Sequence, residues 1–220
     1  MPKERNIKGD QLLIFDCDGV LVDSEILSVK TIVQLLERQS IITNEKEIAL
    51  FFKGAKLDSI FNDITRHFAI KKANNFPESF HVLFEEKLDS ELKAISGIKE
   101  ALDNLIQPKC VASSAPLSKI RKVLSLTGLH KYFGDLLYSS FDINSWKPEP
   151  EIFLYAASSM GFHPSNCIVI EDTVAGIKAA KRAGMTVLGY SPTNCNQDLI
   201  DNGAIVFSDM LQLPKIITNL

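Results

Sequence analysis

The residues with the clearest chemical potential lie near the N-terminus, where the apolar run Leu12 to Phe15 leads into Asp16, Asp18 and Gly19. A short, unbroken apolar run predicts a β-strand that is buried on both faces. Carboxylates at the carboxyl end of such a strand lie where open α/β sheets hold their ligands. Asp16 could therefore be a metal ligand and a nucleophile, with Asp18 free to carry protons. Taken alone, the same run could also be an ordinary Asx turn.

Two later segments place polar groups where an anion could bind. Ser113 and Ser114 end an apolar segment and precede an expected helix, so their hydroxyls and the backbone N–H groups would face an anion. Lys147 lies in a proline-framed loop, where its ammonium could balance an acidic pocket that also takes a phosphate. Each segment has a structural alternative, which is an N-cap serine in the first case and a solvated loop lysine in the second.

A second pair of acids repeats the pattern of the first strand. Glu171 and Asp172 follow the apolar segment 167–170, and beside Asp16 they would supply the oxygen ligands that Mg²⁺ prefers. The alternative is that they are acidic residues in the first turn of the next helix. All these groups together match phosphoryl transfer, which needs a metal, a cationic clamp, an in-line nucleophile and an acid/base.

The elements that must position these groups alternate between strand and helix in the second half of the chain. Strands are predicted over Lys109–Ser113, Asp135–Ser139, Cys167–Ile170, Met185–Tyr190 and Ala204–Phe207. Helices are predicted over Ile98–Ile106, Ser118–Leu126, Glu149–Met160 and Val174–Ala183. This alternation favours a parallel sheet with right-handed crossovers.

The region between the first strand and this part of the chain has a different hydrophobic pattern. Residues 24 to about 90 show helical periodicity with no convincing strand, which is enough for a small module of helices. We therefore expect an α/β protein with a Rossmann-like parallel-sheet core, formed by residues 1–22 and 95–220. The helical module, residues 23–94, is inserted after the first strand.

Composition limits the range of functions. The chain has 220 residues, 45% of them hydrophobic, and a formal charge of −3, so it lacks the basic balance of a general nucleic-acid binder. Its Cys residues are far apart and form no C-x-x-C pair, which is typical of reduced thiols in a cytoplasmic protein. No apolar run approaches the ~18 residues of a membrane span. We expect a monomer or small homo-oligomer that acts on a small phosphorylated metabolite.

The segment Asp16 to Glu25, together with Ser113, Lys147-Pro148 and Glu171-Asp172, resembles the four motifs of the haloacid dehalogenase superfamily. The resemblance spans nearly the whole chain and is to the subclass with a helical cap after the first strand. It is strongest in the branch of β-phosphoglucomutase and small sugar-phosphate phosphatases. Two further stretches, Phe52 to Leu57 and Tyr138 to Pro150, resemble bacterial 6-phosphogluconate phosphatases.

The resemblance implies a mechanism. It makes Asp16 the nucleophile that forms an aspartyl-phosphate, and Asp18 the acid that protonates the leaving oxygen and later activates water. It implies that Mg²⁺ is held by Asp16, the backbone carbonyl of Asp18 and Asp172, with Glu171 nearby. Ser113 and Lys147 would hold the transferring phosphoryl group, with Ser114 beside them in the substrate site.

Two residues differ from those of related enzymes and so limit the activities that this chain is expected to have. Dehalogenases of the superfamily lack the second acid of the first motif, so Asp18 disfavours dehalogenation. β-Phosphoglucomutase carries a histidine shortly after that motif, and Ser28 stands at the matching position, which favours hydrolysis over mutase activity. A phosphosugar mutase and a non-catalytic phospho-ligand-binding protein with the same fold are the alternatives to a phosphatase.

Substrate selection is expected to lie with the cap. Lys53 and Lys56 stand beside Gly54 in a loop between two predicted helices, where they could contact an anionic or polyhydroxylated end of the substrate. Lysines that satisfy carbonyls at helix ends are the alternative interpretation.

Overall fold

The computed structural model describes residues 11–52, 57–70, 75–192 and 196–220. The chain divides into two compact units. One combines Met1–Val22 with Ala94–Leu220, and the other is the intervening segment Asp23–Lys93. The larger unit combines a β-sheet with helices, and the helices of the smaller unit pack around an apolar core of their own.

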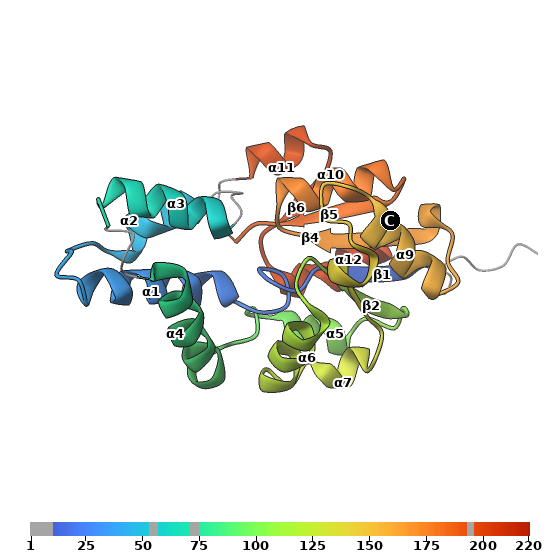
Figure 1. Cartoon of the computed structure of the whole chain (residues 1–220). Helices are drawn as coiled ribbons and strands as arrows, with labels where there is room; N and C mark the ends of the chain where they lie inside the picture. Colours follow the sequence, from blue (N-terminus) through green and yellow to red (C-terminus); the bar gives the residue numbers. More distant parts are fainter. Residues whose placement is uncertain (1–10, 53–56, 71–74, 193–195) are drawn as a thin grey trace, which may run out of the picture. The chain divides into compact units, whose positions relative to one another are not determined.

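The larger unit is built on a six-stranded parallel sheet in the order β3-β2-β1-β4-β5-β6 (Figure 1). Its strands are β1 (Leu12–Phe15), β2 (Lys109–Ser113), β3 (Leu137–Ser139), β4 (Cys167–Glu171), β5 (Thr186–Tyr190) and β6 (Ile205–Phe207). β1 lies in the middle, with Phe15 in register with Val111 of β2 and Ile170 of β4. The carboxyl ends of β1, β2 and β4 therefore meet at the same edge of the sheet.

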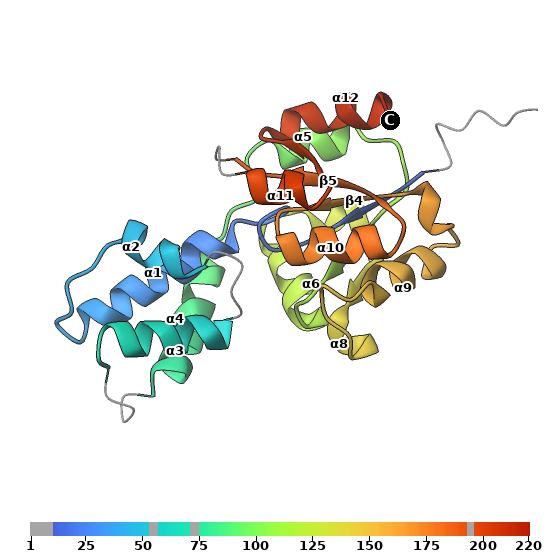
Figure 2. The same cartoon turned by 90° about the horizontal axis from the view of Figure 1, so that it is seen from above.

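Helices cover both faces of this sheet. Figure 2 shows α5 and α12 on one side of the strands and α9 and α10 on the other. The helices of this unit are α5 (Ile98–Asp103), α6 (Leu117–Leu126), α7 (His130–Phe133), α8 (Ser140–Ile143), α9 (Glu151–Ser159), α10 (Val174–Arg182), α11 (Gln197–Asp201) and α12 (Leu213–Thr218). Short 3-10 helices occur at η4 (Pro164–Asn166) and η5 (Met210–Gln212).

The side chains of β1 alternate between the two faces, and all are fully buried. Leu12 and Ile14 belong to the apolar cluster formed with α9 and α10. Phe15 points to the opposite face, where its ring meets that of Phe133 edge-on, with the centroids 5.7 Å apart. Burial on both faces explains why this strand reads as a continuous apolar run rather than an alternating one. By the same alternation, Asp16 follows on the α9 side.

Among its described residues, the smaller unit has helices as its regular secondary structure. It contains α1 (Ser24–Glu37), α2 (Glu45–Ala49), the 3-10 helix η2 (Leu50–Phe52), α3 (Leu57–His67) and α4 (Phe76–Glu91). α1 packs against α2 and α4. Phe61 of α3 meets Phe80 of α4 edge-on with the centroids 5.0 Å apart, and Phe80 stacks on Phe84. Aromatic pairs of this kind add about 0.5–1.5 kcal/mol each beyond the burial of their area.

The structure confirms the predicted fold class, an α/β core with a parallel sheet and an inserted helical segment. The predicted strand at 135–139 is shorter, because only Leu137 to Ser139 pair with β2. Asp23 precedes α1 without a side-chain cap hydrogen bond, and Ser24 is already helical. No helix in the described part of the chain is both long and apolar enough to cross a membrane.

Candidate active site

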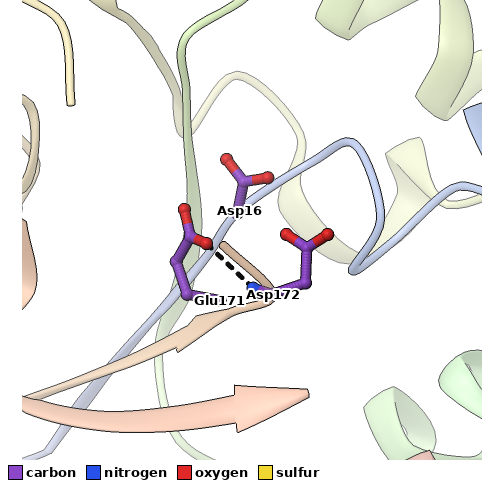
Figure 3. Close-up of side chains that lie close together, drawn as sticks. All are labelled: Asp16, Glu171 and Asp172. Atoms are coloured by element: carbon purple, nitrogen blue, oxygen red, sulfur yellow. Dashed lines mark hydrogen bonds between the residues drawn. The ribbon is translucent and has the colours of Figure 1, made fainter. Parts of the chain in front are cut away.

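The ends of β1 and β4 bring three carboxylates together. The backbone N–H of Asp16 donates to the carbonyl of Ile170 at 2.9 Å, which extends the pairing of the two strands by one residue. Asp16, Glu171 and Asp172 each present a carboxylate oxygen within 4.8 Å of the others (Figure 3). Three hard oxygen donors at this spacing could bind one divalent cation. The sequence predicted this convergence from the two apolar-then-acidic segments.

Lys147, in the loop before α9, contacts two of these carboxylates. Its Nζ lies 2.5 Å from Asp16 Oδ1 and 2.7 Å from Glu171 Oε1, and it also donates to the carbonyl of Ala112 at 3.3 Å. The side chain is only 6% exposed, and its ammonium lies 5.0 Å from the ring centroid of Phe153. One buried cation therefore connects the ends of β1, β2 and β4.

Glu171 is held by more than Lys147. Its Oε2 accepts hydrogen bonds from the backbone N–H groups of Asp172 and Thr173, at 2.8 and 2.7 Å, and from the Thr173 hydroxyl at 2.9 Å. Thr173 in turn caps α10 by accepting from the N–H of Gly176. The Glu171 carboxylate is thus fixed at the start of α10, where the helix dipole favours a negative charge.

The electrostatics of this cluster follow from burial. Desolvation raises the pKa of Asp16 from 3.8 to about 7, because it outweighs the opposing effect of the Lys147 ammonium, and the nearby Glu171 charge raises it further. Burial alone would lower the pKa of Lys147, but the Asp16 and Glu171 carboxylates hold it above its usual value. Lys147 therefore stays charged. The proton that burial favours on Asp16 would be displaced by a bound divalent cation.

Asp18, two residues beyond Asp16, contacts a lysine that the sequence did not single out. Lys119 Nζ lies 3.1 Å from Asp18 Oδ1 and 3.0 Å from Oδ2. Desolvation would lower the pKa of Lys119, but the Asp18 carboxylate raises it above its ordinary value. The available signal was its position in the first turn of α6, where a cation is opposed by the helix dipole and needs a compensating partner.

The serine segment forms the turn between β2 and α6. Ser113 is buried at the end of β2, and its hydroxyl accepts from the N–H of Ala115 at 3.1 Å. The hydroxyl of Ser139, at the end of β3, donates to the carbonyl of Ala115 at 2.7 Å and so ties the turn to the sheet. Ser114 is exposed between them. The turn brings Ser113 to the strand edge that carries Asp16.

Lys53, Gly54, Lys56 and Ser28 are the remaining residues that the sequence singled out. Lys53, Gly54 and Lys56 lie outside the described residues, so their contact with substrate stays a prediction. Ser28 lies in α1, where its hydroxyl donates to the carbonyl of Ser24 at 3.2 Å. Trp146, beside Lys147, is 39% exposed and packs edge-on against Phe141.

The donor set fits a divalent metal by both type and charge. The cluster carries the acids Asp16, Asp18, Glu171 and Asp172 against the cations Lys119 and Lys147, which leaves two negative charges when all are ionised. All the acidic donors are oxygen, as Mg²⁺ prefers. One divalent cation would neutralise the excess.

Known proteins are similar to this chain in sequence and in fold. Residues 13–190 match the haloacid dehalogenase-like hydrolase family. The chain is 32% identical over 209 residues to the 6-phosphogluconate phosphatase of Escherichia coli strain K12, covering 94% of each. A solved structure of a conserved haloacid dehalogenase-like protein of unknown function from Agrobacterium tumefaciens matches with a TM-score of 0.86 and 33% identity, over 96% of this chain and 99% of that chain. The solved structure of a putative β-phosphoglucomutase from Thermotoga maritima matches with a TM-score of 0.83 and 25% identity, over 96% of this chain and 99% of that chain. These similarities confirm the resemblance inferred from the motifs.

Proposed function

Because the chain belongs to the haloacid dehalogenase-like hydrolase family, we propose that it is a Mg²⁺-dependent phosphatase of small phosphosugars such as 6-phosphogluconate. The observation that carries the proposal is the meeting of Asp16, Asp172 and Lys147 at one edge of the sheet. The substrate class is that in the name of the Escherichia coli relative, which matches along nearly its full length.

Asp16, Asp172 and the backbone carbonyl of Asp18 would hold the metal. Glu171 belongs to the same cluster, but its oxygens already accept hydrogen bonds from Lys147, Thr173 and a backbone amide. We therefore assign Glu171 chiefly to the placement of Lys147. When bound, Mg²⁺ would neutralise charge on the phosphoryl group and on the Asp16 carboxylate.

The reaction proceeds in two steps on this chain's own residues. In the first, an Asp16 oxygen forms a bond to phosphorus while the bond to the ester oxygen breaks, and Asp18 gives that oxygen its proton. In the second, a water oxygen forms a bond to phosphorus while the bond from phosphorus to Asp16 breaks, and the Asp18 carboxylate takes a proton from that water. The products are inorganic phosphate, the free alcohol and regenerated Asp16.

Lys147 and the turn at Ser113 would hold the phosphoryl oxygens between them. Lys147 is buried and stays charged, so it provides a fixed positive charge where negative charge develops on the transferring group. The N-terminus of α6 follows the turn and would add backbone N–H groups that can bind an anion.

Hydrolysis is favoured over mutase activity by residue 28. The hydroxyl of Ser28 is engaged with its own helix, and its side chain has no imidazole with which to hold back water. We further propose that the helical unit Asp23–Lys93 selects the substrate. The predicted contacts of Lys53 and Lys56 would be part of that selection.

A screen of phosphorylated metabolites tests the function, with free phosphate as the readout and paired reactions in Mg²⁺ and in EDTA. We expect phosphate release from phosphosugars in Mg²⁺ only, and no isomeric sugar phosphate among the products. An isomer formed without phosphate release would identify a mutase. If no compound of the screen released phosphate in Mg²⁺, and p-nitrophenyl phosphate also did not react, the proposal would be refuted.

A further inference from the structure

The lysine that contacts Asp18 comes from a distant part of the chain. Lys119 is on α6, 101 residues from Asp18 in sequence, and its Nζ contacts both oxygens of that carboxylate at 3.1 and 3.0 Å. The two side chains are only 29% and 33% exposed. Asp18 itself lies on the turn after β1, beyond the reach of the β-ladder that fixes Asp16. The carboxylate therefore needs side-chain contacts to set its orientation.

Stability alone does not account for this pair. Partly exposed ion pairs contribute about 0–1 kcal/mol, and ordering a lysine side chain opposes that gain. The position is also unfavourable for a cation, since Lys119 lies in the first turn of α6, near the positive end of the helix dipole. What the contact does achieve is geometric, because an ammonium close to both oxygens holds the Asp18 carboxylate in place beside α6.

We propose that Lys119 is a positioning residue for proton transfer by Asp18, an inference that rests on the proposed phosphatase function. When Asp18 gives its proton to the departing ester oxygen, a carboxylate forms, and the Lys119 ammonium stabilises it in place. When water then attacks, the same carboxylate accepts the water's proton. Lys119 keeps its own proton throughout and contacts neither the phosphoryl group nor the metal.

This role predicts that the effect of losing Lys119 depends on the leaving group. An alkoxide needs protonation as it departs, whereas p-nitrophenolate is stable enough to leave without a proton. The comparison uses kcat/KM, which reports the steps up to release of the alcohol. The alkyl ester is 6-phosphogluconate, or whichever alkyl phosphate of the panel reacts fastest.

We expect Lys119→Met and Lys119→Gln to lower kcat/KM for the alkyl phosphate by about 10- to 100-fold, mainly through kcat, and for p-nitrophenyl phosphate by less than about 3-fold. Lys119→Arg should restore most of the activity on the alkyl ester, since a guanidinium binds both oxygens of a carboxylate. The control is Arg121→Met, which removes a cation from the same helix. Arg121 pairs with the exposed Asp135 at 2.5 Å, so the control should leave kcat/KM unchanged for both esters.

Thermal melting confirms that each variant is folded before rates are compared. Equal losses on both esters, unchanged rates, or no recovery with Lys119→Arg would overturn the positioning role. So would a rise in KM for the alkyl ester at constant kcat, because that result would mean that Lys119 binds substrate. A wild type that hydrolyses neither ester in Mg²⁺ would instead overturn the proposed phosphatase function, and this inference with it.

Discussion

Gly19 and Asp172 approach so closely that only a residue without a side chain fits at position 19. A Cβ built on Gly19 would overlap Oδ2 of Asp172. Gly19 also has a φ of +82°, in the left-handed region that glycine adopts without strain. The turn after β1 thus limits the space for the carboxylate of Asp172, which follows β4 and is one of the expected metal ligands.

The first prediction concerns Gly19→Ala, which should weaken metal binding. The added methyl group would displace the Asp172 carboxylate, so the Mg²⁺ concentration for half-maximal activity should rise by at least about 10-fold. The matched control is Gly161→Ala. Gly161 has a φ of +77° and no atom within 4 Å of the added Cβ, so the control carries similar backbone strain without the overlap. Equal Mg²⁺ requirements in the two variants would contradict the argument.

Gly176→Ala should lower the stability of the protein, although a change from glycine to alanine within a helix usually raises it. Replacing a helical glycine by alanine ordinarily stabilises a protein by about 1 kcal/mol. Here the Cβ would overlap the buried carboxylate of Glu171, so we expect a destabilisation of about 1–3 kcal/mol, measured by denaturant unfolding. Activity should fall as well, because Glu171 holds Lys147. Ser158→Ala on the exposed side of α9 is the control, with an expected change within about 0.5 kcal/mol.

Asp16→Asn should abolish turnover while leaving the protein folded. The amide keeps the shape of the side chain but is a poor nucleophile, so phosphate release should fall by at least about 10³-fold. The control is Asp135→Asn, whose carboxylate is exposed and pairs with Arg121. Near-normal rates with Asp16→Asn would refute the nucleophile assignment.

The stability of the metal-free protein should depend on pH through Asp16. Burial raises its pKa to about 7 in the folded protein, against 3.8 as its ordinary value. Between about pH 4 and 7 the folded state therefore binds more protons than the unfolded state, so this group's contribution to the free energy of unfolding falls as the pH rises. Asp16→Asn lacks this proton. In EDTA, its stability relative to the wild type should therefore increase from pH 4 to 7 and level off above that.

Saturating Mg²⁺ provides the complementary measurement. The cation would take the place of the Asp16 proton, so the wild type should lose less stability between pH 4 and 7 in Mg²⁺ than in EDTA. Parallel curves for the wild type and Asp16→Asn in EDTA would show that Asp16 does not titrate in this range.

The convergence of the main acidic groups was predictable because it depends on local patterns. Apolar runs identified β1 and β4, and the carboxyl ends of parallel strands share an edge, so Asp16 and Asp172 were expected to meet. The position of Lys147 followed from its motif. Its burial and its hydrogen bonds to Asp16, Glu171 and Ala112 did not, because they depend on how the loop before α9 folds over the strand ends.

The sequence by itself determined the class of fold, the inserted helical segment and the acids at the strand ends, because hydrophobic periodicity and strand termination are local properties of a chain. Only the tertiary structure decided which distant groups touch. It paired Lys119 with Asp18 and set Gly19 against Asp172, since those contacts depend on how α6 and the turn after β1 are placed at the end of the sheet. Contacts between side chains that are far apart in the sequence produce no periodic pattern along it, so they cannot be predicted from periodicity.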